Sequence, residues 1–227
     1  MGYNDWGLLD RLYWSPEELA DLATELSRIA TEEIEVYIKE AYAHVDELGT
    51  SKAWTGKLFN DLADLMNDQK GLFETNIKIL AEEIPGKLSE SANADARASD
   101  APLPTYTPSS VSSDYEVTLT DDDGTGTLTF EAETVGEKNT AFTTALKNAL
   151  DGLNHYKGEF SKILDEALST KARAYSAYIG VAERVHAQCS EKFTEFSTTY
   201  IEKAQASEEA INAADTESGE KADEIDV

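Results

Sequence analysis

Trp54-Thr55-Gly56 lies between two long segments whose apolar residues recur with helical spacing. Before the tripeptide, the apolar residues are Leu19, Leu22, Leu26, Ile29, Val36, Val45 and Leu48. After it, they are Leu58, Leu62, Leu65, Leu72, Ile77, Leu80, Ile84 and Leu88. Most of these steps are three, four or seven residues, so each segment carries one apolar stripe along a helix. Because glycine can leave the right-handed helical region and a large aromatic ring can cover an open end, the tripeptide predicts the turn of an antiparallel helical hairpin.

Local signals set the expected bounds of the two helices. Ser15-Pro16-Glu17-Glu18 combines a capping serine, a proline suited to the first helical position and a glutamate that can close a capping box. The first helix is therefore expected to run from about residue 16 to 48. The second is expected from about 55 to 95, with Pro85 kinking it or breaking it near Glu83.

The arrangement resembles the WXG family, the small helical hairpins that type VII (ESX-like) secretion systems of Gram-positive bacteria export. The resemblance covers about residues 15–100. It rests on Trp54-Thr55-Gly56, on Phe59 at the family's aromatic position, and on the segment Leu80–Leu88 with its Ile-Pro-x-x-Leu pattern. Members of this family pair as dimers that bury a four-helix core.

The resemblance implies that Trp54, Gly56 and Phe59 form a turn and recognition motif. It also implies a secreted protein without a cleaved signal peptide, cytoplasmic before export. Its partners would be secretion-system components or a co-secreted helical protein. The family's Tyr-x-x-x-Asp/Glu motif is not found after the second helix, because residues 92–100 contain no tyrosine. Residues 1–6 have neither the basic nor the apolar region of a Sec signal.

A composition change separates this hairpin from the middle of the chain. Residues 101–114 are rich in proline and serine and predict a linker. In residues 115–135, apolar and polar residues alternate on both sides of an Asp-Gly turn. This pattern predicts a β-hairpin that packs against the helices. Three consecutive aspartates, at 121–123, also suggest calcium, but the EF-hand spacing fails and a structural turn is favoured.

Residues 136–214 predict a second helical hairpin. Its two apolar stripes are formed by Phe142, Leu146, Leu150, Leu153, Phe160, Ile163 and Ala167, and by Val181, Val185, Cys189, Phe193, Phe196, Tyr200, Ala204 and Ile211. Between them, Tyr178-Ile179-Gly180 is interpreted as a second elbow, with Tyr178 and Gly180 in the roles of Trp54 and Gly56. The alternative is one unbroken helix. Residues 1–14 predict an aromatic arm packed on the bundle or on a partner, and residues 215–227 a disordered acidic tail.

Charge and cysteine content exclude several classes of protein. The chain has 45 Asp and Glu against 19 Lys and Arg, which gives a net charge of −26. This charge disfavours binding to nucleic acid and to anionic lipid. A single cysteine, Cys189, excludes an intramolecular disulfide and is expected to pack as a small apolar residue. No segment approaches the roughly 20 apolar residues of a membrane span.

The sequence contains no recognisable catalytic motif. His44, His155 and His186 fall on three different expected helices, without the spacing of a metal site. Cys189 and His186 are three residues apart, yet no third group orients them. There is no Walker loop and no Gly-x-Ser-x-Gly, and the chain has a single Glu-x-x-His, Glu183 to His186, where a di-iron site needs one on each of two facing helices. We therefore expect no enzyme, no cofactor and no metal.

These patterns together predict a mainly α fold: an elongated antiparallel four-helix bundle of two helical hairpins with a short inserted β-hairpin. The expected function is protein–protein interaction in type VII secretion, as an exported substrate or as a partner that escorts one. Two hairpins in one chain favour a monomer, and a homodimer through other surfaces stays open. The alternative is a membrane-acting, pore-forming toxin component. The carboxylates of the expected β-tongue argue against it, because their insertion into lipid is costly.

Overall fold

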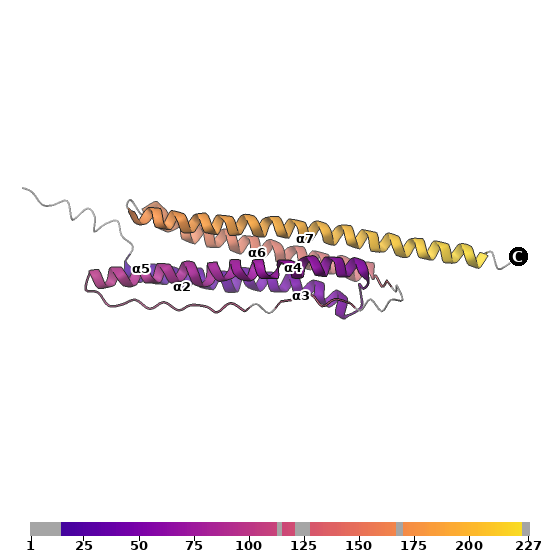
Figure 1. Cartoon of the computed structure of the whole chain (residues 1–227), viewed down its shortest axis with the longest axis horizontal. Coiled ribbons are helices and arrows are strands. Elements are labelled where there is room, and N and C mark those ends of the chain that lie inside the picture. The colour runs from indigo at the N-terminus through magenta and orange to yellow at the C-terminus, as the bar shows by residue number, and fades with distance from the viewer. Residues whose placement is uncertain (1–14, 113–114, 121–127, 167–169, 224–227) are drawn as a thin grey trace, which may run out of the picture. The chain divides into compact units, whose positions relative to one another are not determined.

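The computed structural model describes residues 15–112, 115–120, 128–166 and 170–223, and the predicted N-terminal arm lies outside this set. As predicted, the chain is mainly helical, with four long helical stretches in two hairpin-like pairs (Figure 1). The first pair consists of α2 (Pro16–Arg28), the π-helix η1 (Ile29–Glu35) and α3 (Val36–Thr50), followed by α4 (Lys57–Lys78), the π-helix η2 (Ile79–Glu83) and α5 (Ile84–Ala98). The second pair consists of α6 (Ala132–Glu166) and α7 (Thr170–Asp223).

The start of α2 is the capping box that the sequence predicts. The Ser15 hydroxyl accepts a hydrogen bond from the Glu18 amide at 3.2 Å, and the Glu18 carboxylate accepts one from the Ser15 amide at 2.7 Å. Pro16 occupies the first turn, where its missing N–H leaves no acceptor unpaired. The first helical stretch then continues to Thr50, close to its expected end.

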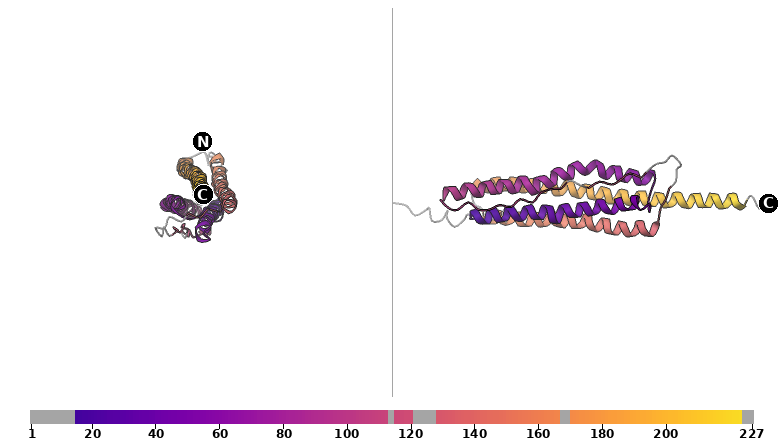
Figure 2. Two further views of the ribbon diagram at one scale, coloured as in Figure 1. Left: turned by 90° about the vertical axis from the view of Figure 1, so that its right-hand side faces the viewer. Right: turned by 90° about the horizontal axis from the view of Figure 1, so that it is seen from below.

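The chain forms two compact units, and each takes segments from all four helical stretches. Unit 1 consists of Met1–Tyr37, Leu72–Ser113 and Asn148–Ser190. Unit 2 consists of Ile38–Gly71, Asp114–Lys147 and Glu191–Val227. In each unit, helices from both halves of the chain lie side by side (Figure 2).

In unit 1, Pro85 changes the helix type instead of breaking the helix. The π-helix η2 comes directly before it, and the Ile84 amide donates to the Ile79 carbonyl in place of the Leu80 carbonyl. Proline has no N–H for the Ala81 carbonyl. Hydroxyl groups from neighbouring helices donate hydrogen bonds to both of these carbonyl oxygens. Tyr156 donates to the Leu80 carbonyl at 3.0 Å, and Ser27 donates to the Ala81 carbonyl at 2.7 Å.

A close helix contact lies beside this site in unit 1. A Cβ atom on Gly152 of α6 would lie 2.7 Å from the Glu33 carbonyl oxygen of η1, so only glycine allows this approach. Residues 101–112 run along α2 and η1 without helix or strand. Their amides use side-chain acceptors, with Ser109 donating to Ser27 Oγ at 2.9 Å and Ser112 to Glu35 Oε1 at 2.8 Å.

The second elbow predicted at Tyr178-Ile179-Gly180 is wrong, because α7 runs through it without interruption. α6 ends at Glu166 and α7 begins at Thr170, and the residues between them lie outside the described set. A Cβ on Gly180 would meet nothing within 4 Å, so this glycine is tolerated in the helix and marks no turn. Tyr178 packs edge-on against Phe160 of α6, with ring centroids 6.4 Å apart. It therefore contributes to the helix interface.

The predicted β-hairpin at 115–135 is also wrong where the structure describes it. Residues 115–120 are extended and residues from Ala132 onward are helical, and the described residues contain no strand, only an isolated bridge between Trp54 and Phe130. The Asp-rich turn at 121–127 lies outside the described set. Burial alternates from Tyr115 to Thr118 and breaks at the exposed Leu119, and the hydrogen-bond partners of the segment are helix side chains and not a second strand.

The predicted disordered tail is helical as far as Asp223, because α7 continues to that residue. Residues 215–223 are acidic and poor in apolar residues, yet they continue the helix. Residues 224–227 lie outside the described part of the chain. Among the helices described, none combines the length and apolarity needed to cross a bilayer.

Candidate interaction site

The connection between α3 and α4 in unit 2 contains Trp54 and Gly56, as the sequence predicts. The chain reverses by adopting positive φ at Lys52 (64°) and at Gly56 (94°). The left-handed region is open to glycine and costly for most other residues, which explains the glycine at 56. The Trp54 amide donates to the Leu48 carbonyl at 3.1 Å, which ties the turn back to the end of α3.

Trp54 is completely buried and its ring is fixed by a hydrogen bond. Its relative exposure is 0%, and its Nε1–H donates to Ser207 Oγ of α7 at 3.0 Å. Ser207 in turn donates to the Lys203 carbonyl at 2.9 Å. The Trp54 ring contacts aromatic rings edge-on at centroid distances of 5.8, 5.8 and 5.4 Å, from Phe59, Phe130 and Tyr200. Trp54 therefore closes the end of the helices from inside and presents no surface to a partner.

Phe59 lies against the last turn of α3. Its side chain is fully buried, and a Cβ on Gly49 would come within 2.7 Å of its ring. The third residue of the predicted motif thus has the same packing role as Trp54. The recognition role that the resemblance gives to Trp54, Gly56 and Phe59 would have to involve the surface around them.

Two extended segments cover the turn in unit 2. Thr55 donates to the Thr129 carbonyl at 3.0 Å, and Glu131 donates to the Ala53 carbonyl at 2.8 Å. These bonds form the antiparallel bridge between Trp54 and Phe130. The Gly56 amide donates to Thr120 Oγ1 at 3.1 Å. The turn is therefore held by the segment that precedes α6 as well as by residue 120.

Two asparagines of α4 hold residues 115–120 by their backbone. Asn67 donates to the Val117 carbonyl at 2.8 Å and accepts from the Val117 amide at 2.9 Å. Asn60 does the same with Thr120, at 3.0 and 2.9 Å. From α3, Asp46 Oδ1 accepts from the Thr118 amide at 2.7 Å. These contacts replace the ladder bonds that a second strand would provide.

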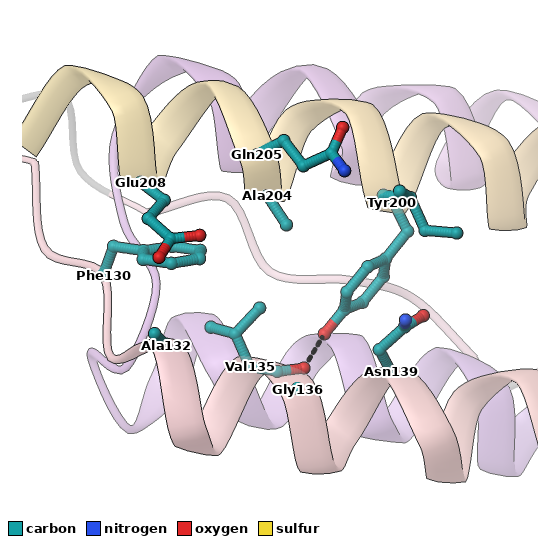
Figure 3. A pocket seen from close by; sticks show the side chains of 10 residues that line it. Phe130, Ala132, Val135, Gly136, Asn139, Tyr200, Ala204, Gln205 and Glu208 are labelled. Carbon is teal, nitrogen blue, oxygen red and sulfur yellow. Dashed lines mark hydrogen bonds between the residues drawn. The ribbon is translucent and has the colours of Figure 1, made fainter.

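A pocket opens beside the aromatic cluster of unit 2, with a volume of about 170 Å³ (Figure 3). At one end, the buried Tyr200 hydroxyl donates to the Val135 carbonyl at 2.8 Å, and its burial raises the pKa of Tyr200 above the usual value. At the other end, Glu208 lies next to the Phe130 ring. The remaining lining residues are Ala132, Gly136, Asn139, Ile201, Ala204 and Gln205. The pocket is mostly apolar and has room for one apolar side chain.

An ion pair on unit 2 links the two halves of the chain. The Asp61 carboxylate lies 2.7 Å from Lys203 Nζ of α7 and 2.7 Å from Lys57 Nζ of α4. Hydrogen bonds from Lys203 and then Lys57 hold the pKa of Asp61 below its usual value. The groups are partly exposed, so this pair orients α7 more than it stabilises the fold.

The other titratable residues that the sequence suggested lie apart and form no reactive cluster. In unit 1, Cys189 is buried, and desolvation raises the pKa of its thiol to about 12. Burial also lowers the pKa of His186. His155 Nδ1 lies 2.7 Å from Glu33; burial opposes ionisation of Glu33, but hydrogen bonds from His155 and Arg28 outweigh it and lower the pKa of Glu33. Within the described residues, no group of three His, Cys, Asp or Glu side chains could hold a metal ion.

Sequence reasoning missed Ser207, Asn60 and Asn67. The two asparagines are seven residues apart on α4, directly after Phe59 and Met66 of the buried stripe. Polar amides at that spacing beside an apolar stripe are a usable signal for a bound extended segment. Ser207 gives no such signal, because its partner is 153 residues away.

Comparison of the chain with protein-family models, with curated proteins and with solved structures finds no match.

Proposed function

We propose that this chain is a non-enzymatic interaction protein of a Gram-positive type VII (ESX-like) secretion system. It acts as an exported substrate or as a partner that escorts one. The resemblance of residues 15–100 to the WXG hairpins supports this proposal, as does a turn built from Trp54, Gly56 and Phe59. The described residues form a folded helical scaffold.

The observation that carries the proposal is the contact between Trp54 and Ser207. It joins the second half of the chain to the turn of the first. This supports the proposal because the resemblance implies pairing of two hairpins. In unit 1, the bond from Tyr156 to Leu80 joins the same two halves. Covalent linkage makes this pairing independent of concentration. The apolar seam is already used within one chain, so a partner would bind the outer faces of the helices.

The test is export in the bacterium that encodes the chain. Immunoblots of culture supernatant should detect the protein when the membrane ATPase of the secretion system is present, and should lose it when that ATPase is deleted. A cytoplasmic marker controls for lysis. Equal amounts in both supernatants would contradict the proposal.

Liposome leakage distinguishes the alternative, a membrane-acting toxin component. The ionised carboxylates at Glu116, Glu131 and Glu133 make insertion of this region costly, so we expect no dye release at neutral pH. Rapid release from liposomes of neutral lipid would favour a toxin component over an interaction protein.

A further inference from the structure

Between α3 and α4 of unit 2 lies a groove that binds extended backbone. We define this α3–α4 groove by Asp46, Gly56, Asn60 and Asn67. Each asparagine amide bonds both the N–H and the C=O of a single residue, Thr120 for Asn60 and Val117 for Asn67. The asparagine contacts themselves require only that the bound residue have a backbone N–H, and the side chains of the bound segment supply the preference for particular residues.

The spacing of the two asparagines matches an extended ligand. Seven residues along a helix cover about 10.5 Å. Three residues of extended chain, from Val117 to Thr120, cover about 10 Å. Residues three apart in a regular strand turn their N–H and C=O groups to opposite edges, so the segment departs from regular strand geometry between Val117 and Thr120 to make both amide contacts. A helical ligand of the same length would not reach both. The spacing on α4 thus selects extended backbone.

Side-chain selection falls on three positions of the bound segment, residues 115, 117 and 120. Tyr115 and Val117 are only 5% and 1% exposed, and the Tyr115 ring lies 5.0 Å from the ring of Tyr42. Glu116, Thr118 and Leu119 face solvent. At the last position, the Thr120 hydroxyl accepts from the Gly56 amide at 3.1 Å. The groove thus prefers an aromatic residue, then a β-branched residue two positions later, then a hydroxyl three positions after that.

We propose that the α3–α4 groove is an exchangeable binding site for an extended segment of a partner protein, with residues 115–120 as its intramolecular occupant. The segment is held by side-chain hydrogen bonds and two buried side chains, all of which an incoming segment of the same pattern reproduces. A second copy of the chain is a poorer source, because two molecules of charge −26 repel each other. The proposal does not depend on a role in secretion.

The intramolecular occupant sets the strength of partner binding. A tethered segment competes at an effective concentration on the order of millimolar. Weak ligands therefore do not displace residues 115–120 from the wild-type groove. A segment displaces them only if its affinity for the groove is higher or its local concentration is high. Removal of residues 115–120 as a competitor should strengthen binding of a free peptide.

The experiment uses the full chain and a fluorescent synthetic peptide, Tyr-Glu-Val-Thr-Leu-Thr with blocked ends. In the vacated variant, residues 115–120 are replaced by an alternating Gly-Ser sequence of the same length. Fluorescence anisotropy should show saturable binding to this variant, and binding to the wild type at least tenfold weaker. A peptide of scrambled order is the ligand control. Asn67→Leu in the vacated variant should weaken binding at least tenfold, whereas Asp68→Asn in the same variant, a change at an exposed position of α4, should leave binding unchanged.

If the vacated variant does not melt cooperatively, Val117→Asp serves instead, because a buried carboxylate expels the segment while the rest of the chain is unchanged. A folded variant that binds no peptide at millimolar concentration would overturn the proposal. So would equal binding of the scrambled peptide, or full binding after Asn67→Leu. Wild-type dimers that the free peptide dissociates would also overturn it, since they would make a second copy the natural source of the segment.

Discussion

The indole N–H of Trp54 donates to the hydroxyl of Ser207 at 3.0 Å, across 153 residues of sequence. Because Trp54 lies in the turn of the first hairpin and Ser207 lies on the last helix, this bond joins the two halves of the chain at one buried point. Tyr200, two turns before Ser207, packs edge-on against the same indole. The turn of the first half is therefore completed by the second half.

Trp54→Ala should lower the free energy of unfolding by about 3–5 kcal/mol, as expected for removal of a buried large aromatic side chain. Ser207→Ala should cost about 1–3 kcal/mol, since it leaves a buried N–H without its acceptor. Urea denaturation of both single variants and of the double variant measures the coupling. Loss of less than about 1 kcal/mol on Trp54→Ala would show that the indole is not a core residue.

Pro85 and Ser27 should be energetically coupled, because the Ser27 hydroxyl serves a carbonyl that proline leaves without its helical donor. Ser27→Ala should cost about 1–3 kcal/mol in the wild type. In a Pro85→Ala background, the residue 85 amide can bond to the Ala81 carbonyl, so the same change should cost at least about 0.5 kcal/mol less. Thermal and urea unfolding of the four proteins completes the cycle. Strict additivity would show that the serine does not compensate for the proline.

Gly152→Ala should destabilise the chain by about 1–3 kcal/mol, because the new methyl group would lie 2.7 Å from the Glu33 carbonyl. Gly158→Ala, on the same helix, is the matched control. It meets nothing within 4 Å and should stabilise the helix by up to about 1 kcal/mol. Differential scanning calorimetry of both variants should give melting temperatures that change in opposite directions. A shift of the same sign would argue against close contact between α6 and η1.

Cys189 should be inert toward thiol reagents at pH 8 until the protein unfolds. Its thiol is buried, and its pKa is raised to about 12 from an ordinary value near 9. An acid whose pKa is higher in the folded state favours folding while it stays protonated. Its contribution is thus complete below about pH 9 and is lost as the pH rises toward 12. Labelling kinetics with a chromogenic disulfide should follow the unfolding transition in urea, and rapid labelling of native protein would contradict the burial.

The features that the sequence predicted correctly are those encoded by neighbouring residues. The capping box at Ser15, the turn at Trp54-Thr55-Gly56 and the four helical stretches all have local signals. The false second elbow at Tyr178-Ile179-Gly180 shows the limit of such signals. A glycine ends a helix when the backbone must take positive φ, as at Gly56, and an isolated glycine such as Gly180 simply remains helical.

Residues 115–120 show a second limit. Their alternation predicts the burial of Tyr115 and Val117 but not the exposure of Leu119, and it cannot specify what pairs with the backbone. Asn60, Asn67 and Asp46 supply those bonds from helices, so an extended segment forms without a strand partner. Long-range partners such as Ser207 depend on how the helices assemble and have no signature in nearby sequence.

The central claim is that the two halves of the chain complete one another, and separate expression tests it most directly. Residues 1–123 and 124–227 should each be poorly folded or self-associating, because each exposes the apolar stripe that the other covers. Circular dichroism of an equimolar mixture should recover one cooperative helical melt. Two halves that each melt cooperatively, at temperatures unchanged by mixing, would contradict the claim.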